Sequence, residues 1–156
     1  MQTLYCRKIA SNQYQVLRPF KIQTPIVSEI PVITKFYILH THGLLELLPG
    51  YVWNGGDWPA IDTDNMIYAS AIHDVFCQML YNSEITWYWR KTVNTFFVEV
   101  LESVGKIIIK KGPKYLVNTR IFVLHQRCKW VYKGVDKLGP NPRKKYVSKQ
   151  MMAIPG

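Results

Sequence analysis

Residues 65–81 read NMIYASAIHDVFCQMLY, and this stretch decides the fold. It is apolar at nearly every position, and a helix that is apolar around its whole circumference must be enclosed by the rest of its domain. Asp62, Thr63 and Asp64 precede it with residue types that favour a helix N-terminus. We therefore predict a central, buried helix over residues 65–81.

Two further helices are expected after this one. Residues 84–104 place apolar side chains at spacings of three and four, which predicts an amphipathic helix that packs on the first. A basic linker follows Gly105, and Pro113 is well placed in the first turn of a third helix that runs to about residue 133. From Gly134 the chain is polar, basic and rich in proline, which predicts an extended tail.

Strands are expected before the central helix. Residues 13–23 alternate loosely between polar and apolar, as one or two short strands would. Residues 32–40 and 44–48 indicate a hairpin with its turn at 40–43, and residues 51–53 could add another strand. The order predicts an α+β fold: N-terminal antiparallel strands with a hairpin, about three packed helices and a basic C-terminal tail. We expect one domain over residues 1–133 and a tail over residues 134–156.

Composition narrows the class of protein. A chain of 156 residues with 48% apolar residues and a mean hydropathy of −0.07 can bury a core without disulfides. No apolar run approaches the roughly 18 residues that a membrane span needs, and the first residues show no secretory signal, so we expect a protein that does not span a membrane and is made in the cytoplasm. The odd, widely spaced Cys6, Cys77 and Cys128 do not suit zinc, and we expect buried thiols in a reducing compartment.

Positive charge is concentrated in the last third of the chain. Residues 1–102 carry seven Lys/Arg and nine Asp/Glu, whereas residues 103–156 carry thirteen Lys/Arg and one acid, Asp136. Aromatic residues interleave with these cations, which favours contact with nucleic acid or an acidic protein; a solvated helix face is the alternative. The cations singled out for contact with an anionic partner are Lys110, Lys111, Lys114, Arg120, Arg127, Lys129, Arg143, Lys144 and Lys145, and the aromatic residues are Tyr115, Phe122, Trp130 and Tyr132.

One loop and one helical pair form the strongest candidate site. In the loop Trp53-Asn54-Gly55-Gly56-Asp57, the glycines let the backbone approach a ligand closely and Asp57 supplies a carboxylate, although a tight turn also explains the sequence. His73 and Asp74 are ionisable residues on an otherwise apolar helix, so they need partners. They are either an acid/base or metal pair, or a core histidine and a carboxylate that hold the loop by hydrogen bonds.

Other side chains could complete this site. Arg90 and Asn94 lie one turn apart on the second helix, and Arg90 could neutralise Asp74 or clamp an anionic ligand, unless it is simply solvated. His40 and His42 could join His73 and Asp74 around a divalent metal. The alternative for His40 and His42 is an exposed pair in a hairpin turn.

These motifs resemble a family of short phage and prophage proteins of unknown function, number thirteen-fifty-three in the unknown-function series. The matching stretches are residues 51–59, 69–80 and 90–97, and the resemblance covers roughly residues 45–130. It implies a pocket in which the loop acid, the His-Asp pair and an Arg and Asp of the second helix converge, but no known reaction. Asn54 and Asn94 stand where the family has Asp, and an amide cannot ionise or anchor a metal strongly, which weakens a catalytic role.

We therefore expect a phage-encoded interaction or assembly protein, made in the host cytoplasm, with a place in the virion as the narrower form of the hypothesis. Its pocket would be mainly structural and its basic end would bind other phage proteins or nucleic acid. One alternative is a hydrolase-like enzyme acting on cell wall or phosphoesters, with His73 as acid/base, Asp74 and Asp57 as carboxylates, Arg90 stabilising negative charge and a divalent metal as cofactor. The other is a nucleic-acid-binding module. The structural pocket would comprise Trp53, Asn54, Gly55, Gly56 and Asn94.

Overall fold

Strands precede helices in the computed structural model, which describes residues 2–55 and 63–141. Within these residues the strands are β1 (Cys6–Ala10), β2 (Gln13–Val16), β3 (Phe20–Gln23), β4 (Val32–Ile33), β5 (Tyr37–Leu39), β6 (Leu44–Leu47) and β7 (Val52–Asn54). The helices are α1 (Asp64–Tyr81), α2 (Arg90–Lys110) and α3 (Val117–Leu138), with short 3-10 turns η1 (Trp87–Trp89) and η2 (Lys114–Leu116). The predicted α+β fold is confirmed.

The strands form two antiparallel sheets, one in the order β1-β2-β7 and one in the order β3-β6-β5-β4. The predicted hairpin is β5 and β6, and its turn lies at residues 40–43 as expected. His40 donates its backbone N–H to Leu44 at 2.9 Å, and Gly43 has a φ of +83°. A Cβ on Gly43 would lie 2.6 Å from the carbonyl oxygen of Thr24, so this turn requires glycine.

The sequence prediction differs from the structure at two places in the sheets. Residues 32–40 form two strands instead of one, because the hydroxyl of Thr34 accepts the N–H groups of Phe36 and Tyr37 and stabilises a turn. Strand β1 was not predicted. Apart from the half-buried Cys6 its residues are exposed, so the alternation that marks a half-buried strand is missing.

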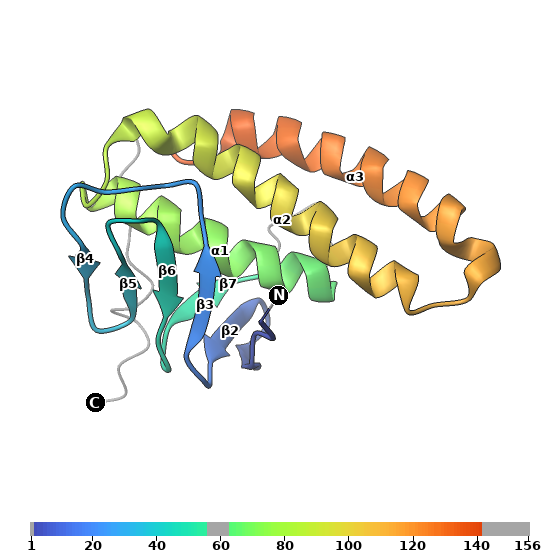
Figure 1. The fold of residues 1–156 in the computed structure, drawn as a ribbon, viewed down its shortest axis with the longest axis horizontal. Helices are drawn as coiled ribbons and strands as arrows, with labels where there is room; N and C mark the ends of the chain where they lie inside the picture. Colours follow the sequence, from blue (N-terminus) through green and yellow to red (C-terminus); the bar gives the residue numbers. More distant parts are fainter. Residues whose placement is uncertain (1, 56–62, 142–156) are drawn as a thin grey trace.

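Helix α1 is the central element, as predicted. In Figure 1 it lies between the sheets and α2, and α3 packs along the far side of α2. Its side chains are buried around most of its circumference, with Ala69, Ala71, Val75, Met79 and Leu80 fully enclosed. This arrangement explains why residues 65–81 lack a polar stripe.

The predicted boundaries of the second and third helices are wrong. Helix α2 begins at Arg90 and not at residue 84, because Thr86 is extended and η1 intervenes. It continues through Gly105 to Lys110, since Gly105 serves as a point of close helix contact and not as a stop. Helix α3 begins after Pro113 and η2, and it ends at Leu138, so the predicted tail boundary at residue 134 falls inside a helix.

No helix in the described part of the chain is both long and apolar enough to cross a membrane.

Candidate functional site

Asp74 binds the loop that follows β7. The backbone N–H of Asn54 donates to Oδ2 of Asp74 at 3.2 Å. Next to it the indole N–H of Trp53, whose side chain is buried, donates to the hydroxyl of Ser70 on α1 at 3.1 Å. The N–H of Gly55 donates to the carbonyl oxygen of Asn12. These bonds fix the predicted loop to α1 and to the turn between β1 and β2.

His73 contacts α2. Its Nε2 lies 3.2 Å from Oδ1 of Asn94, and its ring centroid lies 4.7 Å from that of Phe97. Cys77, one turn further along α1, places Sγ 3.5 Å from Nδ1 of the same ring. The sequence motifs that pointed to Asn54, His73, Asp74 and Asn94 thus identify residues that the structure brings together as two contacting pairs.

Two amide atoms in these pairs are buried without a hydrogen-bond partner, Oδ1 of Asn54 and Nδ2 of Asn94. Asn54 joins the loop to α1 through its backbone N–H and not through its side-chain oxygen. A buried polar atom without a partner costs about 1–3 kcal/mol. Within residues 2–55 and 63–141, Asn54 and Asn94 are therefore positions with unmet hydrogen-bonding capacity.

Arg90 contacts the end of α3, and no ion pair joins it to Asp74 among the described residues. Its Nε donates to the carbonyl oxygen of Pro140 and one terminal nitrogen donates to that of Asp136, each at 2.6 Å. A further guanidinium nitrogen lies 4.0 Å from the carboxylate of Asp136. Arg90 therefore holds the end of α3, where helix carbonyls carry partial negative charge.

His40 and His42 lie side by side at the β5–β6 turn, with ring centroids 5.6 Å apart. Nε2 of His40 contacts Glu46 at 2.9 Å, and Lys21 contacts the same carboxylate oxygen at 2.8 Å. The bonds from Lys21 and His40 lower the pKa of Glu46. Among residues 2–55 and 63–141, His, Cys, Asp and Glu side chains form no group of three or more that could hold a metal.

Most of the described cations that sequence analysis singled out lie on the hairpin of α2 and α3. We call the exposed side chains of residues 106–137 the hairpin surface. Arg127 is the exception, since it is half-buried and donates to the hydroxyl of Thr63 at 3.0 Å. The cations of this surface are Lys106, Lys110, Lys111, Lys114, Arg120, Lys129, Lys133 and Lys137.

Large apolar side chains accompany these cations. The exposed fractions are 83% for Tyr115, 64% for Phe122 and 58% for Trp130. Ile107, Ile108 and Val123 are also exposed, and sequence analysis did not single them out. The run of isoleucines at residues 107–109, followed by two lysines, a glycine and a proline, was the signal that could have marked an apolar helix tip.

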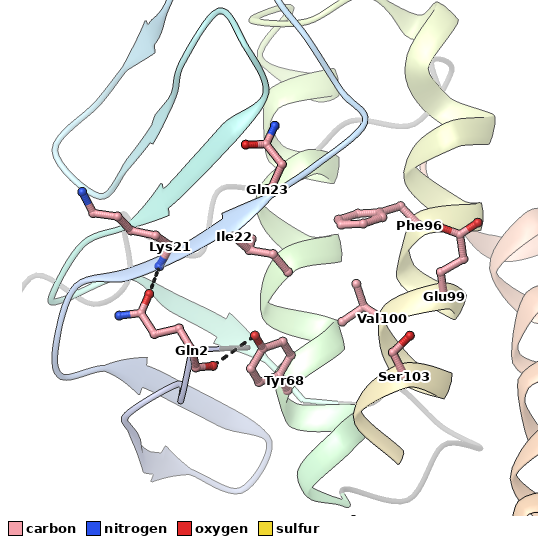
Figure 2. A pocket seen from close by; sticks show the side chains of 9 residues that line it. All are labelled: Gln2, Lys21, Ile22, Gln23, Tyr68, Phe96, Glu99, Val100 and Ser103. Carbon is pink, nitrogen blue, oxygen red and sulfur yellow. Dashed lines mark hydrogen bonds between the residues drawn. The ribbon is translucent and has the colours of Figure 1, made fainter. Parts of the chain in front are cut away.

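A surface depression of about 390 Å³ lies between β3, α1 and α2. Figure 2 shows Ile22, Phe96 and Val100 pointing into it. The amide of Gln2 donates to Pro19 and accepts the N–H of Lys21 at 2.7 Å, so this side chain covers the open edge of β3 as a neighbouring strand would. Burial raises the pKa of Tyr68 to about 12, which keeps its hydroxyl a donor to the carbonyl oxygen of Gln2. The lining residues are Gln2, Lys21, Ile22, Gln23, Tyr68, Phe96, Glu99, Val100 and Ser103.

Gly56, Asp57, Arg143, Lys144 and Lys145 lie outside the described residues, and so does most of the predicted tail.

Comparisons with models of protein families, with curated proteins and with solved structures find no match. The resemblance to the phage family stays a prediction from the motifs.

Proposed function

We propose that this chain is an interaction protein that docks on an acidic protein surface through the hairpin of α2 and α3. One observation carries the proposal: the hairpin surface combines eight exposed cations with six exposed large apolar side chains. Exposed large apolar side chains among charged ones on one segment are typical of a protein contact surface. The pair of Asp74 and Asn54 then has a structural role, which is to hold β7 against α1.

The geometry of α3 supports this use. Leu124, Cys128 and Val131 are buried, and they account for the face that packs on α2. Phe122, Gln126 and Trp130 follow one another at a spacing of four on a different face, so they form one stripe along the helix. In Figure 1 the tip of the hairpin extends past the first turn of α1, away from the sheets. The stripe and the tip are thus open to a partner along their length.

The chemistry of the surface favours a protein over nucleic acid and over a second copy of the chain. Protein–DNA interfaces are polar and strongly basic, and phosphates provide no apolar partner for Ile107, Ile108 and Val123. Two copies that met through this surface would bring like charges together, since Asp136 is the only acid in residues 103–156. An acidic protein surface that also carries apolar side chains provides both the opposite charge and the apolar contacts.

The resemblance to phage proteins supports a narrower form of the proposal, in which the partner is another phage protein and the chain takes part in assembly. In that form the protein co-purifies with the virion or with an assembly intermediate. If the protein is absent from the virion and from assembly intermediates, the role in phage assembly is excluded. The proposed docking surface is then tested separately.

Fluorescence anisotropy with three defined probes tests the proposal. The probes are an amphipathic helical peptide of Glu and Leu, its counterpart of Lys and Leu, and single-stranded oligothymidylate. We expect the acidic peptide to bind and the basic peptide not to bind. Replacing Phe122 and Trp130 by Ser should weaken binding more than about tenfold, because large aromatic side chains dominate such contacts.

The matched control is Ile33→Ser, which removes an apolar side chain that is 70% exposed on β4, outside the hairpin. It should leave binding unchanged. Tighter binding of oligothymidylate than of the acidic peptide, with a steep loss in salt and no effect of the Phe122 and Trp130 changes, would identify a nucleic-acid module instead.

A further inference from the structure

Cys77 and His73 contact each other on α1. They are four residues apart, so they project from the same side of the helix. Sγ of Cys77 lies 3.5 Å from Nδ1 and 3.6 Å from Nε2 of the imidazole. Cys77 is half-buried and not fully enclosed, unlike the expectation from sequence that the cysteines are buried small hydrophobes.

Asn94 determines which nitrogen of His73 carries the proton. Its Oδ1 lies 3.2 Å from Nε2, and an amide oxygen only accepts hydrogen bonds. Nε2 of the neutral ring is therefore the N–H donor, and the lone pair is on Nδ1, the nitrogen nearer to the thiol. Phe97 packs on the same ring, so the imidazole is held in one orientation from α2.

Asn94 makes a polar contact at a position where an apolar side chain would also fill the space. The residue is fully buried, yet its Nδ2 has no hydrogen-bond partner. An apolar side chain at this position would avoid that cost, which the contact of Asn94 with His73 offsets. The carboxylate of Asp74, the next residue on α1, accepts the N–H of Asn54 on β7.

The other two described cysteines lie in environments that suppress reactivity. Burial raises the pKa of Cys128 to about 11. Burial, with the negative charge of Asp64, also raises the pKa of Cys6. Both thiols therefore stay protonated near neutral pH, and the thiolate is the reactive form.

We propose that Cys77, His73 and Asn94 form a nucleophilic thiol site that reacts with low-molecular-weight disulfides. The thiol proton passes to Nδ1 of His73 as Sγ attacks one sulfur of the disulfide. A bond forms between the two sulfurs, the original S–S bond breaks, and the leaving thiolate takes the proton from His73. The products are a mixed disulfide on Cys77 and one small thiol. Because Sγ is almost equidistant from the two ring nitrogens, the thiol side chain rotates toward Nδ1 while Asn94, a positioning residue, holds the ring.

The test compares the three cysteines within one molecule. The full-length protein is treated with oxidised glutathione, and the rate of modification at Cys6, Cys77 and Cys128 is read by peptide mass spectrometry. We expect Cys77 to react more than about 100-fold faster than Cys128 near pH 7, because Cys128 is buried and its pKa of about 11 leaves it almost no thiolate. Folded Cys77 should also react about threefold faster than the same residue in the urea-unfolded chain, with a larger ratio near pH 6.

Variants distinguish activation of the Cys77 thiol by His73 from simple exposure of that thiol to solvent. His73→Gln keeps an N–H that can donate to Asn94 but removes the base, and it should reduce the rate at Cys77 to that of the unfolded chain. Asn94→Asp keeps the acceptor for Nε2 and should retain the fast reaction. His125→Gln is the matched control on the exposed side of α3 and should change nothing.

Two results overturn the proposal. One is a rate at Cys77 in the folded native protein that is no higher than the rate in the urea-unfolded chain. This comparison requires no variant. The other is a folded His73→Gln protein, shown by its circular dichroism to be intact, in which the rate at Cys77 is unchanged.

Discussion

Nε of Arg90 lies 2.6 Å from the carbonyl oxygen of Pro140, so the first residue of α2 holds the chain just after the end of α3. The same guanidinium donates to the carbonyl oxygen of Asp136 inside the last turn of α3. A cation at this end of a helix satisfies carbonyl groups that have no partner within the helix. The hairpin surface is therefore fixed to the domain at the end opposite its tip.

Replacing Arg90 by Met should lower the free energy of unfolding by about 1–2 kcal/mol, because hydrogen bonds to charged groups contribute about that amount and the side chain is partly exposed. Urea unfolding followed by tryptophan fluorescence measures the change. Lys91→Met is the control, since Lys91 is exposed and adjacent. Equal stability of the two variants would show that the bonds of Arg90 contribute nothing.

The order of strands and helices could be predicted because it depends on local patterns. Residues 65–81 are apolar all round, and the turn at 40–43 contains the glycine that its backbone needs. Helix ends could not be predicted equally well, because they depend on packing. Gly105 reads as a helix stop in the sequence, but in the fold it is the point where α2 approaches Leu124 of α3.

In the candidate site too, the features that depend on packing could not be predicted from the sequence. Motifs identified His73, Asp74 and Asn94 as polar residues on buried faces, and the structure places them in contacting pairs. The partner of Arg90 could not be predicted, because Pro140 lies fifty residues away in a segment that the sequence assigns to a tail. The spacing of residues along a helix shows which side chains share a face of that helix. It does not show which distant backbone group contacts them.

Gly105→Ala should destabilise the protein by about 1–3 kcal/mol, the usual cost of overpacking a core. An added Cβ would lie 2.7 Å from Cδ2 of Leu124 and 2.9 Å from Nδ2 of Asn65. Gly134→Ala is the matched control within α3, where an added Cβ meets no atom within 4 Å. That change should stabilise the protein by about 0.5–1 kcal/mol, since alanine favours a helix over glycine. Thermal unfolding of both variants checks the opposite signs, and a stabilising Gly105→Ala would show that α2 and α3 are not in close contact here.

Ser70→Ala should cost about 1–2 kcal/mol, because it leaves the buried indole N–H of Trp53 without the acceptor seen in the structure. Ser103→Ala is a matched change in α2, where Ser103 is exposed, and it should be neutral or slightly stabilising. Chemical unfolding gives both values. The loss for Ser70→Ala should disappear in a Trp53→Phe background, and a loss that persists there would mean that the hydroxyl acts elsewhere.

The last prediction concerns pH and Glu46, whose pKa is lowered by its bonds with Lys21 and His40. A carboxyl group with a lowered folded-state pKa stabilises the protein above its unfolded-state pKa, near the ordinary value of 4.5, and loses that contribution as pH falls through the lower value. Glu46→Gln should therefore be about 0.5–1 kcal/mol less stable than the native chain near pH 7, an amount typical of partly exposed ion pairs. The difference should shrink between pH 7 and pH 3, as the pH falls through the lowered pKa of Glu46. Glu29→Gln, a change at an exposed position, should show no such dependence. Urea unfolding at both pH values decides the matter: a difference for Glu46→Gln that stays constant with pH would assign its effect to packing and not to charge.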